Sequence, residues 1–211
     1  MPAPDPFAYP IVPHTPSHGP AGYADAASYK PWLRDDFAFR CAYCLMRERW
    51  DPSPSGHAGF GVDHVQARAV AGELVADYAN LVYACNMCNS MKGTAPLPLQ
   101  PRSAAFGLHV RVGPDGAIEA LTEPGQAFLE LFGLDSPGRD SLRFDKLVIL
   151  RSKQTHPDDA DIDHIFRRAF GYPDDLPDLS VLRPPGGNAV AGSEERSHFA
   201  RWSRGELEAV Y

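Results

Sequence analysis

Residues 41–44 read CAYC and residues 85–88 read CNMC, and these two stretches contain all four cysteines of the 211-residue chain. Two Cys-x-x-Cys pairs are the ligand set of a tetrahedral zinc site, because each pair offers two thiolates from one tight turn. A zinc ribbon without catalysis gives the same pairs, and a disulfide framework is the other alternative. The spacing therefore predicts a structural zinc site with four ligands, Cys41, Cys44, Cys85 and Cys88.

Between the two pairs lies the dipeptide Asp63-His64, and Asn89 follows the second pair. Residues 60–65 are short and apolar, which fits a buried strand, and neighbours on a strand project to opposite faces. Asp63 can then face a cation while His64 faces a water molecule. A neutral imidazole can take a proton at cellular pH, and a carboxylate with an amide oxygen suits hard Mg²⁺. The alternative interpretation is a capping carboxylate beside a surface histidine.

The other elements are predicted from periodicity, caps and turn residues. A strand over residues 79–84 and a helix over 85–91 follow the Asp-His stretch, and Gly113-Pro114-Asp115-Gly116 marks a hairpin. The expected helices cover residues 28–37, 122–132, 140–151 (where a strand is the alternative) and 158–170, with an amphipathic segment over 194–211.

These elements divide the chain into four expected regions. They are a Pro-rich extended arm (1–27), a core with the zinc site (28–102), an α+β extension packing on that core (103–183), and a loose tail with a short amphipathic helix (184–211).

Composition restricts the kind of protein this can be. The net charge of -7 disfavours strong independent binding to nucleic acid, because Lys and Arg supply most backbone affinity. Several cations nevertheless lie in or near the cysteine-bounded segment, which predicts a locally basic cleft. No apolar run is long enough to span a membrane, and no signal peptide is evident. We therefore expect a cytoplasmic protein, where thiols favour zinc over disulfides.

The pattern of paired cysteines, Asp-His-Val, Asn-Leu-Val at 80–82 and Cys-Asn89 followed by Lys92 resembles the HNH endonucleases. The resemblance covers residues 39–93 and extends weakly to residue 150 through the stretch 115–125. It implies an α+β fold: a ββα-metal (HNH) core stapled by a four-cysteine zinc site, with a C-terminal hairpin and helical extension.

The same resemblance implies a role for each motif residue. His64 is the general base, Asp63 and Asn89 hold a catalytic Mg²⁺ or Mn²⁺, and Asn80 fixes the loop and strand geometry. Lys92 matches a common lysine that can approach phosphate or support the helix. Arg68 is assigned with Lys92 to substrate binding, although a solvated arginine is an equally good interpretation.

One departure from the family pattern concerns the loop after His64. Many members follow this histidine with x-Pro or x-x-Pro, whereas residues 65–68 here read VQAR. The loop is then less rigid, while the ligands are unaffected. The third motif residue is Asn rather than His, which favours Mg²⁺ over softer ions.

The sequence therefore predicts a metal-dependent endonuclease that hydrolyses DNA and leaves 5′-phosphate ends, as the family resemblance implies. The acidic balance and the missing reader domain favour gating by a regulatory protein partner, as in restriction or anti-phage defence systems. The alternative is a catalytically silent zinc-binding module that contacts nucleic acid or protein. The oligomeric state is left open.

Overall fold

The computed structural model describes residues 5–51 and 56–211, which divide into two compact units. One unit combines Thr15–Leu97 with Tyr172–Glu208, and we call it the cysteine unit. The helical unit combines Met1–His14, Pro98–Gly171 and Ala209–Tyr211.

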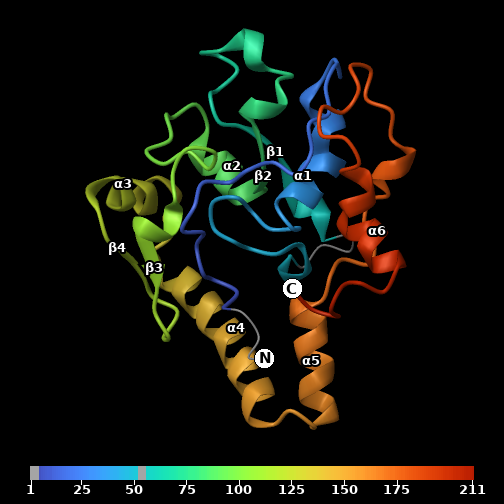
Figure 1. Cartoon of the computed structure of the whole chain (residues 1–211). Coiled ribbons are helices and arrows are strands. Elements are labelled where there is room, and N and C mark those ends of the chain that lie inside the picture. The colour runs from blue at the N-terminus through green and yellow to red at the C-terminus, as the bar shows by residue number, and fades with distance from the viewer. Residues whose placement is uncertain (1–4, 52–55) are drawn as a thin grey trace. The chain divides into compact units, whose positions relative to one another are not determined.

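Two antiparallel strands and one helix form the centre of the cysteine unit (Figure 1). Strand β1 (Phe60–His64) pairs with β2 (Leu81–Cys85), and helix α2 (Asn86–Lys92) follows β2 directly. Strand β2 reads LVYAC and is buried along its whole length. The predicted order of strand, loop, strand and helix is therefore confirmed, and the fold is of the expected mixed α+β class.

Helix α1 (Lys30–Asp36) leads into the first cysteine pair. Pro31 lies in its first turn, and the helix residues Trp32 and Leu33 are fully buried. The chain then reverses through Ala38 and Phe39, whose φ angles are +47° and +58°. Residues with a Cβ adopt this left-handed region at a cost, which the burial of the Phe39 ring offsets.

The segments on either side of the cysteine core are packed rather than loose. His18 is 2% exposed. Its Nε2 lies 2.9 Å from the Asp35 carboxylate, and its Nδ1 lies 2.9 Å from the Ser193 hydroxyl. Gly19 N–H donates to the Asn188 side chain at 2.8 Å. Side-chain hydrogen bonds therefore join parts of the expected arm (1–27) and tail (184–211) to each other and to α1. Such single bonds cannot be predicted from hydrophobic periodicity in the sequence.

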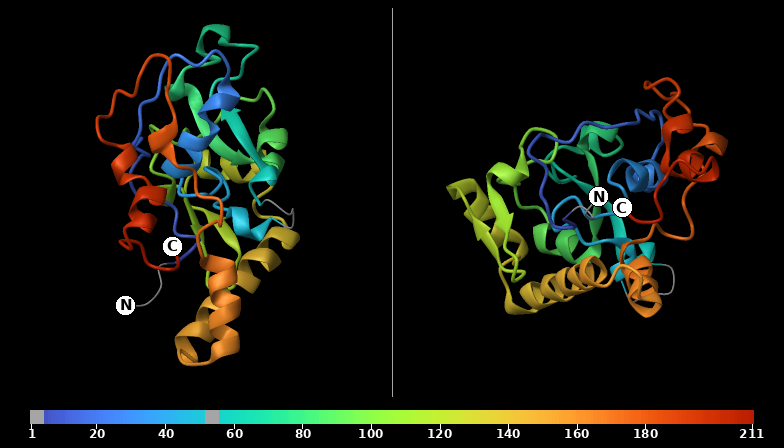
Figure 2. Two further views of the ribbon diagram at one scale, coloured as in Figure 1. Left: turned by 90° about the vertical axis from the view of Figure 1, so that its right-hand side faces the viewer. Right: turned by 60° about the horizontal axis from the view of Figure 1, so that its bottom comes forward.

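Helix α6 (His198–Ser203) lies within this C-terminal segment and runs beside α1 in Figures 1 and 2. His198 N–H donates to the Asp35 carboxylate at 2.8 Å, and its ring meets Phe39 edge to face. The predicted amphipathic segment over 194–211 is thus helical over only part of its length.

The helical unit contains the hairpin and the three longer helices, which confirm the predicted elements. Its strands are β3 (Val110–Val112) and β4 (Ile118–Ala120), and its helices are α3 (Glu123–Phe132), α4 (Pro137–Thr155) and α5 (Ala160–Phe170). Phe106, Phe128 and Phe132 form a buried aromatic core, with ring centroids 4.9 and 5.1 Å apart. Figure 1 shows α4 and α5 as a helical hairpin.

Two glycines in the stretch 115–125 have a steric reason to be glycine. Gly116 has a φ of +83° in the hairpin turn. A Cβ on Gly125 would lie 2.1 Å from the carbonyl oxygen of His109, so only glycine lets α3 start this close to the hairpin.

Short 3-10 helices complete the described chain. They cover Ala26–Tyr29, Glu48–Trp50, His57–Gly59, Gly72–Leu74, Tyr78–Asn80, Phe106–Leu108, Leu179–Val181 and Glu194–Arg196. Residues 52–55, which precede β1, lie outside the described residues. None of the described helices combines the length and apolar character that crossing a bilayer demands.

A buried ion pair joins α1 to the 3-10 helix Glu48–Trp50, and a hydrogen bond from Tyr83 extends it to β2. Glu48 is 1% exposed and accepts two hydrogen bonds from Arg34, at 2.9 and 2.8 Å. The hydroxyl of Tyr83 donates a third at 2.6 Å. A buried carboxylate without its cation is strongly unfavourable, so the pair holds α1 in place.

We expect Arg34→Met to lower the free energy of unfolding by about 3–5 kcal/mol, because Glu48 would stay buried without compensation. Urea unfolding measures this change. Arg204→Met is the matched control, since Arg204 pairs with Glu206 on the surface, and it should have little effect. Equal stability of the two variants would contradict this account.

Candidate metal centre and active site

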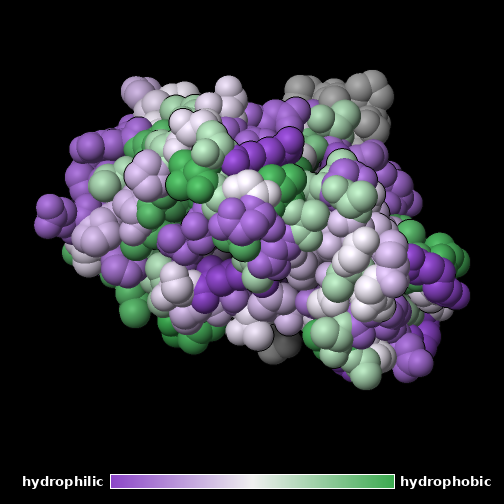
Figure 3. Space-filling view, turned by 90° about the horizontal axis from the view of Figure 1, so that it is seen from above, coloured by the Kyte–Doolittle hydropathy of each residue, from purple (hydrophilic) through white to green (hydrophobic). Residues whose placement is uncertain are grey.

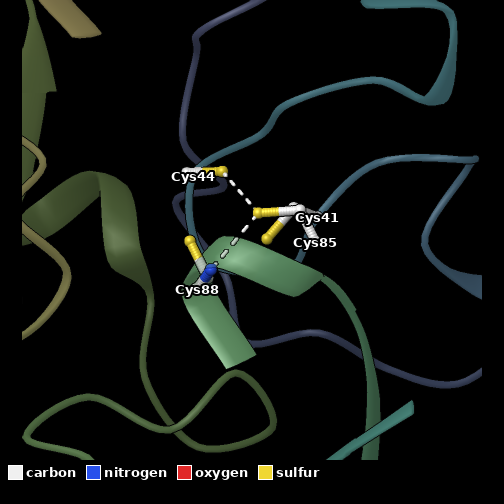
Figure 4. Close-up of side chains that lie close together, drawn as sticks. All are labelled: Cys41, Cys44, Cys85 and Cys88. Carbon is white, nitrogen blue, oxygen red and sulfur yellow. Dashed lines mark hydrogen bonds between the residues drawn. The ribbon is translucent and has the colours of Figure 1, made fainter. Parts of the chain in front are cut away.

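The four cysteine side chains converge in the cysteine unit, as Figure 4 shows. Their sulfur atoms all lie within 4.8 Å of one another, and those of Cys44 and Cys85 are 3.7 Å apart. A tetrahedral zinc ion with Zn–S bonds of about 2.3 Å requires sulfurs about 3.8 Å apart. The donor set and its spacing therefore fit zinc.

Local backbone structure brings the two pairs together. In the first turn, Cys41 N–H donates to the Met46 carbonyl at 2.8 Å, and Leu45 adopts a φ of +59°. In the second, Cys85 ends β2 and caps α2, and its sulfur accepts from Cys88 N–H at 3.5 Å. Each Cys-x-x-Cys pair thus forms a tight turn with both sulfurs on one side.

The pKa values of the clustered cysteine thiols are shifted in different directions. Hydrogen bonds from Cys41, Cys85 and Cys88 hold the pKa of Cys44 well below its ordinary value. Burial raises the pKa of Cys41 well above its ordinary value, and the bonds to Cys44 and Cys85 add to this shift. A divalent cation stabilises thiolates, so metal binding releases the remaining protons.

Asp63 lies on β1 in a buried network. Its Oδ2 accepts a 2.6 Å hydrogen bond from the hydroxyl of Tyr43, and its Oδ1 lies 3.2 Å from the ammonium of Lys92. The backbone N–H of His64 also donates to Oδ1 at 2.8 Å. Burial raises the pKa of Tyr43 well above its ordinary value, and the nearby Asp63 charge adds to the shift. The phenol therefore remains a donor.

His64 projects away from this network, toward the loop that connects β1 to β2. Its Nε2 lies 2.9 Å from the carbonyl oxygen of Val75. Because a carbonyl can only accept, Nε2 carries the proton and Nδ1 carries the lone pair. Arg68 Nε donates toward Nδ1 at 3.5 Å. Burial lowers the pKa of His64, and the charge of Arg68 lowers it further.

Asn80 links both ends of the same loop. Its amide exchanges hydrogen bonds with the backbone of Gln66 at 2.8 and 3.0 Å and donates to the Leu74 carbonyl at 3.2 Å. Leu74 precedes Val75, so Asn80 fixes the segment that orients His64.

Lys92 and Arg68, both assigned to substrate binding from the sequence, occupy different environments. Lys92 is 2% exposed, and its ammonium donates to the His64 carbonyl at 2.5 Å as well as to Asp63. It is therefore enclosed by protein, whereas Arg68 is exposed at the surface beside His64.

The donor groups near Asp63 are compatible with a hard cation. Asn89 is half-buried on α2, and its amide would lie 3.9 Å from a Cβ on Gly61, two residues before Asp63 on the same strand face. Of the four lone-pair sites of the Asp63 carboxylate, three accept hydrogen bonds and one remains on Oδ2. One carboxylate and one amide suit Mg²⁺, which keeps most of its ligands as water and phosphate.

Within the described residues, the four cysteines are the one group of three or more His, Cys, Asp or Glu side chains placed to share a metal. A catalytic cation at Asp63 would therefore take few protein ligands.

Two features of this site were missed from the sequence. Tyr43 lies between Cys41 and Cys44, and a hydroxyl inside a metal-binding turn is the signal that could have drawn attention to it. The Val75 carbonyl is a backbone group, and no residue type in the loop indicates it.

Two strands and one helix form a ββα unit, and its two thiol turns bring together four cysteines that could hold a metal ion. Residues 41–95 match the family model described as HNH endonuclease. This segment is therefore an HNH endonuclease domain, which confirms the resemblance expected there. A search of curated proteins found no match.

We expect the purified protein to contain one equivalent of zinc and Cys88→Ser to lose it. The cysteine unit should then unfold, because metal binding contributes much of the folding free energy of such units. Metal analysis and near-ultraviolet circular dichroism measure both effects. Ser90→Ala, on the exposed side of the same helix, is the control. A Cys88→Ser protein with full zinc and native dichroism would contradict the expectation.

Proposed function

We propose that this protein is a divalent-cation-dependent endonuclease that hydrolyses DNA phosphodiester bonds. The observation that carries the proposal is the imidazole of His64, which the Val75 carbonyl orients within an HNH domain. Orientation by a backbone acceptor places the lone pair of the imidazole on Nδ1, toward which Arg68 Nε makes a long contact of 3.5 Å.

His64 acts as the general base in this proposal. Its lowered pKa keeps the imidazole neutral at cellular pH. Nδ1 removes a proton from the attacking water, and the Nε2–H bond to Val75 stabilises the imidazolium that forms. Water attacks phosphorus, the bond to the 3′ oxygen breaks and that oxygen takes a proton from solvent, so the products carry 5′-phosphate and 3′-hydroxyl ends.

Asp63 and Asn89 hold the catalytic Mg²⁺ or Mn²⁺, and zinc occupies the cysteine site. When bound, the catalytic cation neutralises charge on the phosphate and on the leaving oxygen. Arg68 is the exposed cation beside His64, and we assign it to phosphate contact.

Charge supports gating by a protein partner, which we place in a restriction or anti-phage defence system. The locally basic cleft expected from the sequence is diminished, because Arg34 pairs with Glu48 and Asp175, and Arg49 pairs with Asp174. With a net charge of -7, weak binding to DNA alone follows. On the face drawn in Figure 3, hydrophobic and hydrophilic residues are interspersed.

The four cysteines form no disulfide, and reduced thiols suit the cytoplasm, where we place the protein.

One observation favours the second candidate, a catalytically silent zinc module. Asp63 is 4% exposed and engaged by Tyr43 and Lys92, so the carboxylate has little contact with solvent. The same experiment decides between the two.

We expect the purified protein to nick plasmid DNA slowly with Mg²⁺ or Mn²⁺, because it acts without its partner, and not at all with EDTA. His64→Ala should lower the rate by roughly 10²–10⁴-fold, the usual contribution of a general base. His164→Ala is the matched control, because His164 is exposed on α5 in the other unit.

Cleavage by His64→Ala at the wild-type rate would refute the assignment of the base. A zinc-loaded wild type that cuts neither DNA nor RNA would favour the silent module. Rapid unaided cleavage of any plasmid would contradict gating by a partner.

A further inference from the structure

The carboxylate of Asp63 is held from two directions by Tyr43 and Lys92, which we call the Asp63 clamp. Both side chains are at most 2% exposed, and Asp63 itself is 4% exposed. The clamp is therefore a preformed, water-excluded arrangement. Each of its two members belongs to an element that carries cysteine ligands.

Tyr43 is the third residue of the CAYC turn. Its backbone position is set by the same turn that places Cys41 and Cys44, and its ring is fully buried. The hydroxyl reaches Asp63 Oδ2 at 2.6 Å, so a movement of this turn would move the donor.

Lys92 is the last residue of α2, the helix that begins at the CNMC turn. Its ammonium joins the Asp63 carboxylate to the His64 carbonyl, at 3.2 and 2.5 Å. It therefore fixes the carboxylate relative to the backbone of β1.

These bonds leave Asp63 little freedom. Oδ1 accepts from Lys92 and from His64 N–H, while Oδ2 accepts from Tyr43. Rotation of the carboxylate would break bonds on both oxygens at once. The lone pair that remains on Oδ2 is thus directed by the phenol.

We propose that Tyr43 and Lys92 are positioning residues through which the cysteine site sets the orientation of Asp63 and thereby its affinity for a divalent cation. This inference rests on the proposed role of Asp63 in the nuclease. It assigns the cysteine site a second task, because the first cysteine turn supplies Tyr43 and the helix that begins at the second supplies Lys92.

The chain contains a matched comparison for Tyr43. Tyr83 also donates a 2.6 Å hydrogen bond to a buried carboxylate, that of Glu48, and lies in the same unit. A general loss of stability from removing a buried hydroxyl should appear equally in both tyrosine variants. An effect on cation binding should appear for Tyr43 alone.

The test measures Mn²⁺ binding to the full-length, zinc-loaded protein by electron paramagnetic resonance. We compare the wild type with Tyr43→Phe, Tyr83→Phe and Asp63→Asn. Partners that orient a metal ligand are worth about 10–100-fold in metal affinity. Tyr43→Phe should therefore weaken Mn²⁺ binding by roughly 10-fold or more and keep its zinc, while Tyr83→Phe binds Mn²⁺ like the wild type.

Three results of the Mn²⁺ measurement would overturn the proposed positioning role. Equal Mn²⁺ affinity in the wild type and a zinc-loaded Tyr43→Phe overturns the positioning role, as does an equal loss in both tyrosine variants. If Tyr43→Phe does not hold zinc, Lys92→Gln is judged by the same criterion. If Asp63→Asn binds Mn²⁺ as the wild type does, Asp63 is no metal ligand, and the proposed active site fails together with the inference.

Discussion

The convergence of four thiols is the constraint on which the cysteine unit depends. A two-stranded sheet is marginal without further support, and β1 and β2 contribute only five residues each. The first turn is tied to β2 by the bond from Ala42 N–H to the Tyr83 carbonyl at 2.8 Å. It also holds Leu45 in a left-handed conformation, which persists only where the surroundings enforce it. A metal in this site would replace part of the core that so small a sheet cannot build.

Buried charges are the second determinant of this unit. Glu48, Asp35 and Asp63 are each at most 4% exposed, and each is hydrogen-bonded, to Arg34, His18 and Tyr43 respectively. Burial raises the pKa of Asp35, but bonds from His18 and His198 outweigh it and bring the value to about 2. The same pairing consumes cations that would otherwise attract phosphate. Internal stability and the proposed weak affinity for DNA would thus have one cause.

The sequence predicted the regular elements well, because caps, turns and motif spacing are local signals. The β1–β2–α2 order and α3 after Thr122, whose side chain caps the helix, follow from such signals. The burial of Lys92 could not be predicted in this way. Residue spacing indicates on which face of a short helix a side chain lies, but not how deeply that side chain is buried in the protein. The packing of the terminal segments also escaped prediction, because it depends on single hydrogen bonds such as His18 to Ser193.

The two halves of the candidate active site are supported by different elements. His64 is oriented by the β1–β2 loop, through the Val75 carbonyl and the bonds of Asn80 to that loop. Asp63, on the opposite face of β1, accepts hydrogen bonds from Tyr43 in the first cysteine turn and from Lys92 at the end of α2. A change in the loop should therefore first alter the orientation of His64, the proposed base. A change at the cysteine site should first alter the orientation of the Asp63 carboxylate. The two groups are nevertheless linked through the backbone, because His64 N–H donates to Asp63 Oδ1 and Lys92 bonds both the Asp63 carboxylate and the His64 carbonyl.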